Sequence, residues 1–373
     1  MHDNSARVLM YSNRNVANKI LARCLLWEFE DIVRQVDKVE LLSPGRLSHF
    51  DTGYRIASKV AQYLPIALNP GVEGLCVDAE YELFIAVCNF PTDLLYVNTL
   101  KQWRKKCKTA VCWIDELFVN EMAHVKYLKA LISQFDHVIV SCQQVVKAIK
   151  PYISGDCRFV LPGVDALLFA PDSTSERFID VMSIGRRSEK VHAQLVDAAE
   201  RNGLFYLHDT TCSYGCKYGL TTSEPRQHRR LLANLAKRSK YFLVNTGKFD
   251  EADATGDEEI IGARYFEGAA SGTVMVGRRP NHPEFDNVFF WPDAVIDADP
   301  GARVVKILSE LDLQPERVRQ IRHNNVVNSL LHHDWVYRWE KVLELAGLDP
   351  MPELSERKRA LEGRALTLTE SDD

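Results

Sequence analysis

The sequence lacks the features of several specialised classes of protein. No stretch approaches the roughly 18 consecutive apolar residues that a membrane-spanning helix needs. The first residues, Met1–Arg7, contain no basic region that leads into an apolar stretch, so no secretion signal is expected. The net charge of −5 gives no general electrostatic attraction to nucleic acid. We therefore expect a cytoplasmic protein with no nucleic-acid partner and no membrane span, while contact with a membrane surface stays open.

A recognisable metal site is also missing. The nine cysteines lie mostly in apolar segments without paired zinc spacing, which is typical of reduced, buried thiols in the cytosol. The isolated pair Cys212 and Cys216 is weak support for a metal. Asp297 and Asp299 match an Asp-x-Asp motif, but they follow strand-like residues and precede a Pro-Gly pair, which favours a turn. The acidic segment 250–259 indicates a polar loop, and we expect no metal.

The pattern of the chain predicts two α/β domains. Apolar segments of strand length alternate with helical patterns, which is typical of parallel sheets. With 373 residues, 46% of them hydrophobic, the chain is long enough for two separate cores. We expect a first domain over 1–165 and a second over 172–333, joined through a turn that contains Pro162. The last segment, 352–373, is charged and shows no apolar stripe, so we expect it to be disordered.

In the first domain, polar loops after the expected strands are the places to look for a ligand. Open parallel sheets bind ligands beyond the carboxyl ends of their strands. The expected strands are 7–11, followed by a helix over about 16–30, and then 36–42, 82–88, 109–114, 137–141 and 159–161. The loop residues selected as acceptor-side candidates are Tyr11, Asn13, Arg14 and Glu116, with Asp115 as a catalytic candidate. Asp115 either faces a reaction centre or caps the following helix, and the sequence leaves both readings open. His124 and His208 are candidates by loop position alone.

In the second domain, the most informative stretch runs from Glu259 to Val276. The carboxylates of Glu259 and Glu267 are eight positions apart, with Gly262 between them expected to allow a tight loop before a helix. Backbone N–H groups in the first turn of such a helix, around Ala263 and Arg264, are free to bind a diphosphate. Glu267 follows about one and a half turns later, where it is placed to accept hydrogen bonds from sugar or ribose hydroxyl groups.

Small residues then continue this stretch. Residues 268–272 include two glycines and two alanines, which would let the helix pack closely on a sheet. Residues 273–276 are apolar enough to enter that sheet as a buried strand. Other elements expected in this domain are strands at 178–184, 204–208 and 241–245 and helices at about 191–202 and 227–238.

The stretch resembles the E-x7-E signature of retaining GT-B glycosyltransferases of the group 1 type. Arg264-Tyr-Phe-Glu267 is similar to a pattern of the CgeB-like branch. The resemblance implies a GT-B fold, with two Rossmann-like domains whose parallel sheets face a central cleft. It also implies that a C-terminal helix, here about 334–347, crosses back to the first domain.

The resemblance assigns roles to particular residues. It implies that Glu259 contacts the donor sugar, that Glu267 holds the ribose, and that the backbone from Gly262 through Ala263 to Arg264 binds the diphosphate. Fixed cations stabilise the charge that grows on a leaving diphosphate. The residues that resemble the corresponding Gly-Arg…Lys element are Gly185, Arg186, Arg187 and Lys190, and the sequence leaves open which arginine points inward.

The implied activity is transfer of a sugar from a nucleoside diphosphate sugar, such as a UDP-sugar, to an acceptor hydroxyl group. The resemblance implies retention of configuration, no cofactor, and a role in polysaccharide or glycoconjugate synthesis, with a sugar, lipid-linked or small-molecule acceptor. Ile114 stands where these enzymes usually carry a histidine, so a catalytically silent nucleotide-sugar-binding subunit is the alternative. A dinucleotide-dependent oxidoreductase is disfavoured, because Tyr11–Val16 contains no glycine.

Overall fold

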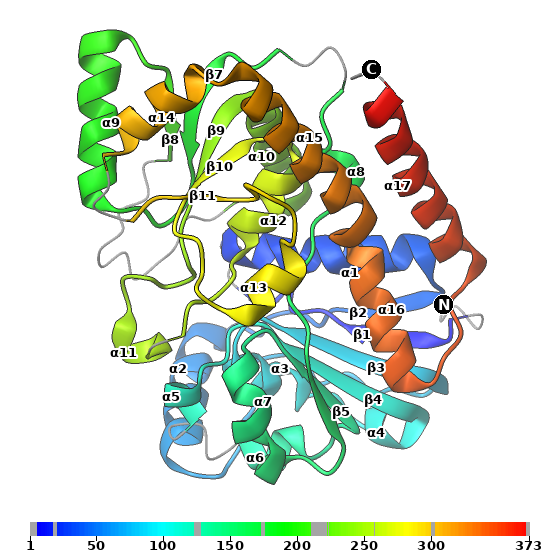
Figure 1. Cartoon of the computed structure of the whole chain (residues 1–373). Coiled ribbons are helices and arrows are strands. Elements are labelled where there is room, and N and C mark those ends of the chain that lie inside the picture. Colours follow the sequence, from blue (N-terminus) through cyan, green and yellow to red (C-terminus); the bar gives the residue numbers. More distant parts are fainter. Residues whose placement is uncertain are drawn as a thin grey trace.

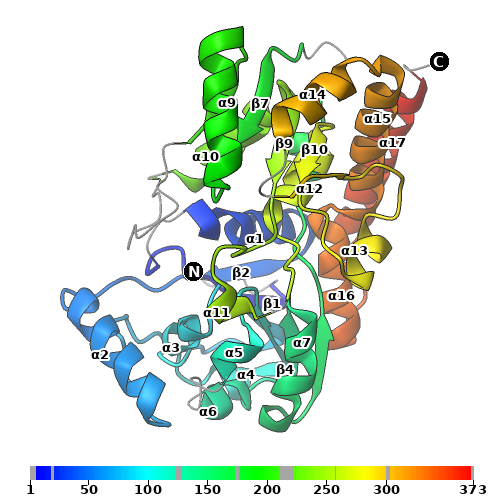
Figure 2. The same cartoon turned by 60° about the vertical axis from the view of Figure 1, so that its left-hand side comes forward.

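The computed structural model describes residues 6–17, 21–122, 128–172, 176–209, 222, 224–256, 258–299 and 303–370. Two α/β domains lie one above the other, with the long helix α1 between them (Figures 1 and 2). Within the described ranges, no helix combines the length and the apolar character needed to cross a membrane.

The first domain is built on six parallel strands in the order β2-β1-β3-β4-β5-β6. The central strands β3 and β4 are buried along most of their length, as continuous apolar runs predict for a sheet that helices cover on both faces. The strands are β1 (Val8–Tyr11), β2 (Val39–Leu42), β3 (Tyr81–Cys88), β4 (Cys107–Ile114), β5 (His137–Val140) and β6 (Asp156–Phe159). The helices are η1 (Leu21–Arg23), α1 (Cys24–Val36), α2 (Phe50–Tyr63), η2 (Pro91–Asp93), α3 (Leu94–Val97), α4 (Trp103–Lys106), α5 (Val119–Met122), α6 (Leu128–Ile132), α7 (Gln143–Ile149), η3 (Lys150–Tyr152) and α8 (Ala166–Phe169).

The second domain has five parallel strands in the order β11-β10-β9-β7-β8. These strands are β7 (Ile179–Ser183), β8 (Tyr206–His208), β9 (Ser239–Val244), β10 (Val274–Gly277) and β11 (Ile296–Asp297). The helices are α9 (Glu189–Asn202), α10 (Pro225–Lys237), α11 (Ala252–Thr255), α12 (Ala263–Ala270), α13 (Pro283–Val288), α14 (Val304–Asp312), α15 (Pro315–His332), α16 (Trp335–Ala346) and α17 (Pro352–Glu370). Because all strands of a sheet run in one direction, the loops that follow them gather at one edge, and the two such edges face each other (Figure 1).

Helix α16 crosses back to the first domain, as predicted. Asp334 accepts a hydrogen bond from the backbone N–H of Val336 and so caps the helix. The indole N–H of Trp335 donates to Glu28 on α1 at 2.9 Å. The indole N–H of Trp339 donates to Asp37, directly after α1, at 3.0 Å. Both tryptophans are fully buried, so α16 fixes the second domain to α1 through packing and hydrogen bonds.

The tail prediction was wrong. Residues 352–370 form α17, which lies beside α15 in Figures 1 and 2. Its buried residues, Leu354, Leu361 and Ala365, make a stripe too thin to be recognised in a charged sequence. Arg357 strengthens the contact, because its guanidinium bonds to both Asp334 and Asp165 at 2.7 Å. Tertiary packing therefore stabilises a helix that the sequence pattern alone did not indicate.

Two local expectations were also tested. The first α-helix begins at Cys24 rather than near residue 16. Residues 13–17 form a polar turn instead, in which the backbone oxygen of Asn13 accepts hydrogen bonds from the N–H groups of Val16 and Ala17.

The close packing of α12 on its sheet is confirmed: a Cβ atom on Gly268 would lie 2.8 Å from the sulfur of Met275. A larger residue there would have to displace the Met275 side chain, so glycine lets α12 pack closely against β10.

Candidate functional site

The donor-side elements meet at the carboxyl edge of the second sheet. The Nε of Arg264 on α12 donates to the carbonyl oxygen of Ile184, just after β7, at 3.1 Å. The N–H of Gly247, just after β9, donates to the carbonyl of Ile260 at 2.8 Å. A pocket of about 450 Å³ opens beside this meeting point, and Glu259 and Arg278 contribute to its lining. A cavity of that size is in the range of ordinary ligand sites.

Glu267 lies on the inner side of α12 and is 1% exposed. Its Oε1 accepts from Arg229 and its Oε2 from Arg264. Burial raises the pKa of Glu267, but the two guanidinium groups outweigh it, so the pKa lies below the usual range for glutamate. The carboxylate is therefore ionised, and both of its oxygens are in use.

Glu259 lies apart from Glu267 and faces the 450 Å³ pocket. Its carboxylate accepts from the Nε of Arg278 at 2.8 Å and from the backbone N–H of Asn281. Arg278 also pairs with Asp299 at 2.8 Å. The two glutamates of the predicted pair thus lie in different surroundings. Glu259 lines the pocket, whereas Glu267 is buried on the inner side of α12.

Gly262 ends the loop before α12 with a φ of −81°, which any residue adopts. A Cβ atom there would meet the backbone of Gly247 at an ordinary 4.0 Å, so the tight loop does not require glycine at this position, contrary to expectation. The first turn of α12, which contains Ala263 and Arg264, still presents backbone N–H groups that have no partner inside the helix. An anion-binding start of α12 therefore stays a prediction.

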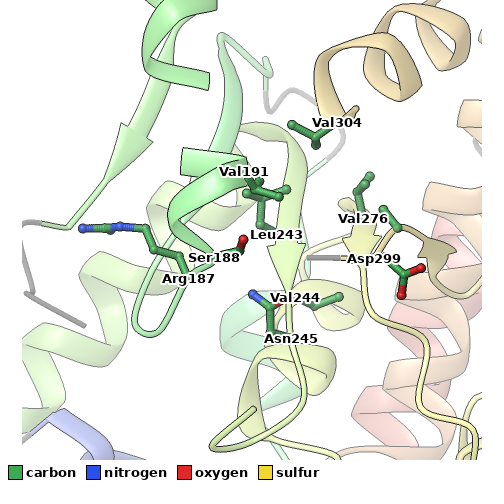
Figure 3. Close-up of a pocket in the computed structure, with 11 residues that line it drawn as sticks. Arg187, Ser188, Val191, Leu243, Val244, Asn245, Val276, Asp299 and Val304 are labelled. Carbon is green, nitrogen blue, oxygen red and sulfur yellow. The ribbon is translucent and has the colours of Figure 1, made fainter. Parts of the chain in front are cut away.

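The two neighbouring arginines after β7 point in different directions. Arg187 is buried and pairs with Asp209 at 2.8 Å, and the N–H of Gly185 donates to the same carboxylate at 2.8 Å. Arg186 is exposed and pairs with Asp250 and Glu251 in the loop before α11. Figure 3 shows Arg187 extending away from the other side chains of its pocket, whose volume of about 20 Å³ suits a water molecule at most. Arg186 is thus the more exposed of the two, and its charge opposes the rise in the pKa of Glu116 on the first domain.

Lys190 and Gly185 complete the basic element. Lys190 is exposed in the first turn of α9. Gly185 has a φ of +90°, which L side chains rarely adopt, and the guanidinium of Arg264 would lie 3.7 Å from a Cβ atom there. Gly185 therefore lets the chain turn sharply while Arg264 packs against it.

On the first domain, Asp115 and Glu116 follow β4, and Glu116 contacts Lys248 of the second domain. Burial, and then the Glu116 carboxylate, raise the pKa of Asp115 to about 7. Burial also raises the pKa of Glu116, although Lys248 opposes this with its Nζ 3.6 Å from the carboxylate. Lys248 belongs to the loop after β9, and its ammonium also lies 4.3 Å from the ring centre of Phe118. Sequence reasoning missed Lys248, although a cation directly after a strand was a usable signal.

The other acceptor-side candidates lie in networks inside the first domain. Tyr11 is buried in the core at the end of β1. Asn13 donates to Asp93 at 3.1 Å and accepts from Trp27 at 2.9 Å. Arg14 pairs with two carboxylates of α1, Glu30 and Asp31. The structure brings none of these three described side chains into contact with Asp115 or Glu116.

The acidic residues considered for a metal are used in other contacts. Asp297 accepts from the backbone N–H of Arg279 at 2.8 Å, but it lies at the end of strand β11 rather than in the turn that the sequence predicted. Among residues that the structure describes, no group of three or more His, Cys, Asp or Glu side chains is arranged to hold a metal ion. His124, Cys212 and Cys216 lie outside the described residues, while His208 contacts the carbonyl oxygen of Asp209 through its ring nitrogen at 3.0 Å.

Comparison with known proteins agrees with this geometry. Residues 187–344 match a family described as glycosyl transferase-like. No curated protein matches the chain. Sucrose-phosphate synthase from Thermosynechococcus elongatus has a TM-score of 0.52 at 12% identity, over 91% of this chain and 98% of that one. Anabaena HepE in complex with UDP-glucose gives 0.52 at 11% identity, over 91% and 99% of the two chains. An alpha-glucosyltransferase in complex with UDP gives 0.54 at 11% identity, over 92% and 100%.

These likenesses identify the fold alone. Two parallel sheets, with a helix that crosses back to the first domain, are the GT-B architecture that the sequence predicted. The chain therefore has a GT-B fold, and its residues 187–344 are similar to the glycosyl transferase-like family.

Proposed function

We propose that the enzyme transfers a sugar from a nucleoside diphosphate sugar, with a UDP-sugar as first choice, to an acceptor hydroxyl group. The observation that carries this proposal is the ionised carboxylate of Glu267, held on α12 beside Arg264 and the Gly185 turn. A carboxylate accepts hydrogen bonds from a ribose diol, and a neighbouring arginine suits a diphosphate. Similar solved structures that contain UDP or UDP-glucose support UDP as the first nucleotide to test.

The other residues take roles that follow from their positions. Glu259, in the 450 Å³ pocket, is placed to accept hydrogen bonds from donor-sugar hydroxyls. Arg186 and Lys190, both exposed after β7, supply positive charge for the leaving diphosphate together with the first turn of α12. We propose that transfer proceeds with retention and without a metal, because these groups can stabilise the leaving charge by themselves.

Asp115 is the first-domain residue best suited to the reaction centre. A carboxyl with a pKa of about 7 can exchange a proton near neutral pH, as a general acid or base must. One observation favours the alternative of a silent binding subunit: Ile114 is fully buried at the end of β4 and offers no polar group there. We propose a cytoplasmic enzyme of the CgeB-like branch that acts in polysaccharide or glycoconjugate synthesis, with a sugar, lipid-linked or small-molecule acceptor.

A thermal-shift panel of UDP-, GDP- and dTDP-sugars tests the proposal. A ligand that binds the native state raises its stability by about 2.7 kcal/mol at a concentration 100 times Kd. We expect one nucleotide series to raise Tm and the other two to have little effect. If no series raises Tm, the donor site is wrongly assigned. Donor hydrolysis by the responsive sugar then separates an enzyme from a silent subunit.

A further inference from the structure

Arg229, on α10, is the buried centre of a chain of charges that joins the two domains. Only 5% of the residue is exposed. Its Nη1 donates to Glu267, while its Nε and Nη2 donate to Glu28 on α1 of the first domain, at 2.7 and 3.1 Å. The face of its guanidinium lies 4.9 Å from the ring centre of Phe169. Both edges and one face of the group are therefore fixed.

The partners of Arg229 are themselves anchored. Glu28 also accepts from the indole of Trp335 at 2.9 Å and from the backbone N–H of Asp165 at 2.9 Å. A buried guanidinium requires such compensation, because an unpaired charge in the interior is strongly unfavourable. The order Arg264–Glu267–Arg229–Glu28 alternates positive and negative charges from the donor side to the first domain.

The two arginines that hold Glu267 differ in their freedom to move. The side chain of Arg264 is 27% exposed, whereas that of Arg229 is 6% exposed. Arg264 can therefore turn towards an incoming diphosphate and release Oε2 of Glu267, whereas Arg229 stays on Oε1. A carboxylate with one oxygen fixed and the other released is suited to accept a hydrogen bond from a ribose hydroxyl group.

We propose that Arg229 is a positioning residue for the donor nucleotide: it orients the carboxylate of Glu267 and anchors it to α1 of the first domain. The proposal rests on the proposed donor site. It goes beyond that site because it gives Arg229 a role that acts through Glu267.

Arg226 provides a matched control on the same helix. It lies one turn before Arg229 and also pairs with a carboxylate of α1, Asp31, at 2.6 Å. Asp31 keeps Arg14 as a second partner. Arg226→Gln therefore removes an α10–α1 ion pair without touching Glu267, whereas Arg229→Gln removes the support of Glu267.

The experiment measures UDP affinity by calorimetry for the wild type, Arg229→Gln and Arg226→Gln between pH 6 and 8. We expect Arg229→Gln to lose at least about tenfold in affinity and Arg226→Gln to stay within about twofold. Without Arg229, burial raises the pKa of Glu267, so the deficit of Arg229→Gln should grow as the pH falls. The titration of UDP itself is common to both variants and cancels in the comparison.

The possible outcomes distinguish a failure of the role of Arg229 from a failure of the donor site itself. Equal affinities and parallel pH profiles for the two variants would overturn the positioning role and leave the donor site standing. If the wild type binds none of UDP, GDP or dTDP, the donor site and the role of Arg229 fail together. Should Arg229→Gln not fold, the double variant Arg229→Lys with Glu28→Gln is used instead, because it keeps one buried cation. We expect the same loss of UDP affinity, because the single nitrogen of lysine cannot reproduce the geometry of the guanidinium group.

Discussion

At the scale of single residues, Asp115 holds its carboxyl group where ionisation is unfavourable. Its pKa of about 7 means that the folded protein binds this proton more tightly than the unfolded chain, whose aspartates titrate near 3.8. The contribution of Asp115 to stability is therefore fully present below about pH 4 and is lost as the pH rises to about 7. A group kept in this condition is a candidate for function.

Asp115→Asn should remove this penalty. We expect the free energy of unfolding of the variant to match that of the wild type at pH 4 and to exceed it at pH 8 by about 1–3 kcal/mol, allowing for water near the carboxylate. Thermal unfolding at both pH values measures the effect. If the variant also loses turnover, the carboxyl serves the reaction; a gain in Tm with normal turnover would show that the reaction does not need it. No difference at pH 8 would contradict the raised pKa.

Residue types in the donor site could be predicted, but their partners could not. Glu259, Glu267 and the small residues after them stand close together in the sequence, so spacing alone predicted a helix and its packing. The link from Glu267 through Arg229 to the first domain is invisible to such reasoning, because Glu28 lies 201 positions from Arg229. Buried ion pairs of this kind depend on tertiary structure, which no local pattern records.

At the scale of elements, the loop before α11 competes for a cation of the donor site. Asp250 and Glu251 both pair with Arg186, in the place where the proposed function needs positive charge for a diphosphate. An incoming diphosphate must displace these carboxylates or share the guanidinium with them. The loop is held near the first domain by a hydrogen bond from Asn120 to the carbonyl oxygen of Asp253 at 3.2 Å.

The double variant Asp250→Asn with Glu251→Gln should bind UDP more tightly. Exposed ion pairs are worth roughly 0.2–1 kcal/mol, so a gain of about two- to fivefold in affinity is expected. Asp253→Asn on α11 is the control, since its contact with Asn120 uses the backbone. Calorimetry with UDP compares the three proteins. Weaker binding by the double variant would mean that the loop orders Arg186 for the ligand instead of competing with it.

Helix α17 shows that a sequence pattern predicts some elements, whereas others form only through tertiary packing. The strands were predicted within a few residues because apolar runs mark buried parallel strands. Helix α17 was missed because its buried face consists of Leu354, Leu361 and Ala365 among charged residues. Its main polar anchor, Arg357, reaches Asp165 at a separation of 192 positions.

Leu361→Ala tests whether this packing matters. Leu361 is fully buried, so the variant should lose about 2–5 kcal/mol of unfolding free energy through lost burial and a cavity. Leu366→Ala, on the same helix and 63% exposed, should change stability by less than about 0.5 kcal/mol. Urea unfolding measures both. A Leu361→Ala variant as stable as Leu366→Ala would show that α17 adds little to the fold.

At the scale of the whole molecule, the two domains meet through complementary charge. Lys248 of the second domain reaches Glu116 at 3.6 Å, and Glu258 accepts from the thiol of Cys142 at 2.6 Å. Together with the Arg229–Glu28 pair, these contacts hold α10 and the segment between β9 and α12 against the first domain. Two of the three contacts pair a cation of the second domain with a carboxylate of the first domain.

This distribution of charge leads to the expectation of metal independence. In the proposed mechanism Arg186, Lys190 and the start of α12 supply positive charge for a leaving diphosphate, so no step of that mechanism requires a Lewis acid. The acidic groups nearby already have partners: Asp250 is held by Arg186, and Asp299 by Arg278. Turnover of the responsive nucleotide sugar, or its hydrolysis, should thus stay within about twofold after treatment with EDTA. The opposite result would be a loss of activity on chelation that Mn²⁺ or Mg²⁺ restores. The carboxylates would then have to leave their arginines and bind the metal. That result would overturn the proposed leaving-group mechanism, although the GT-B fold would still stand.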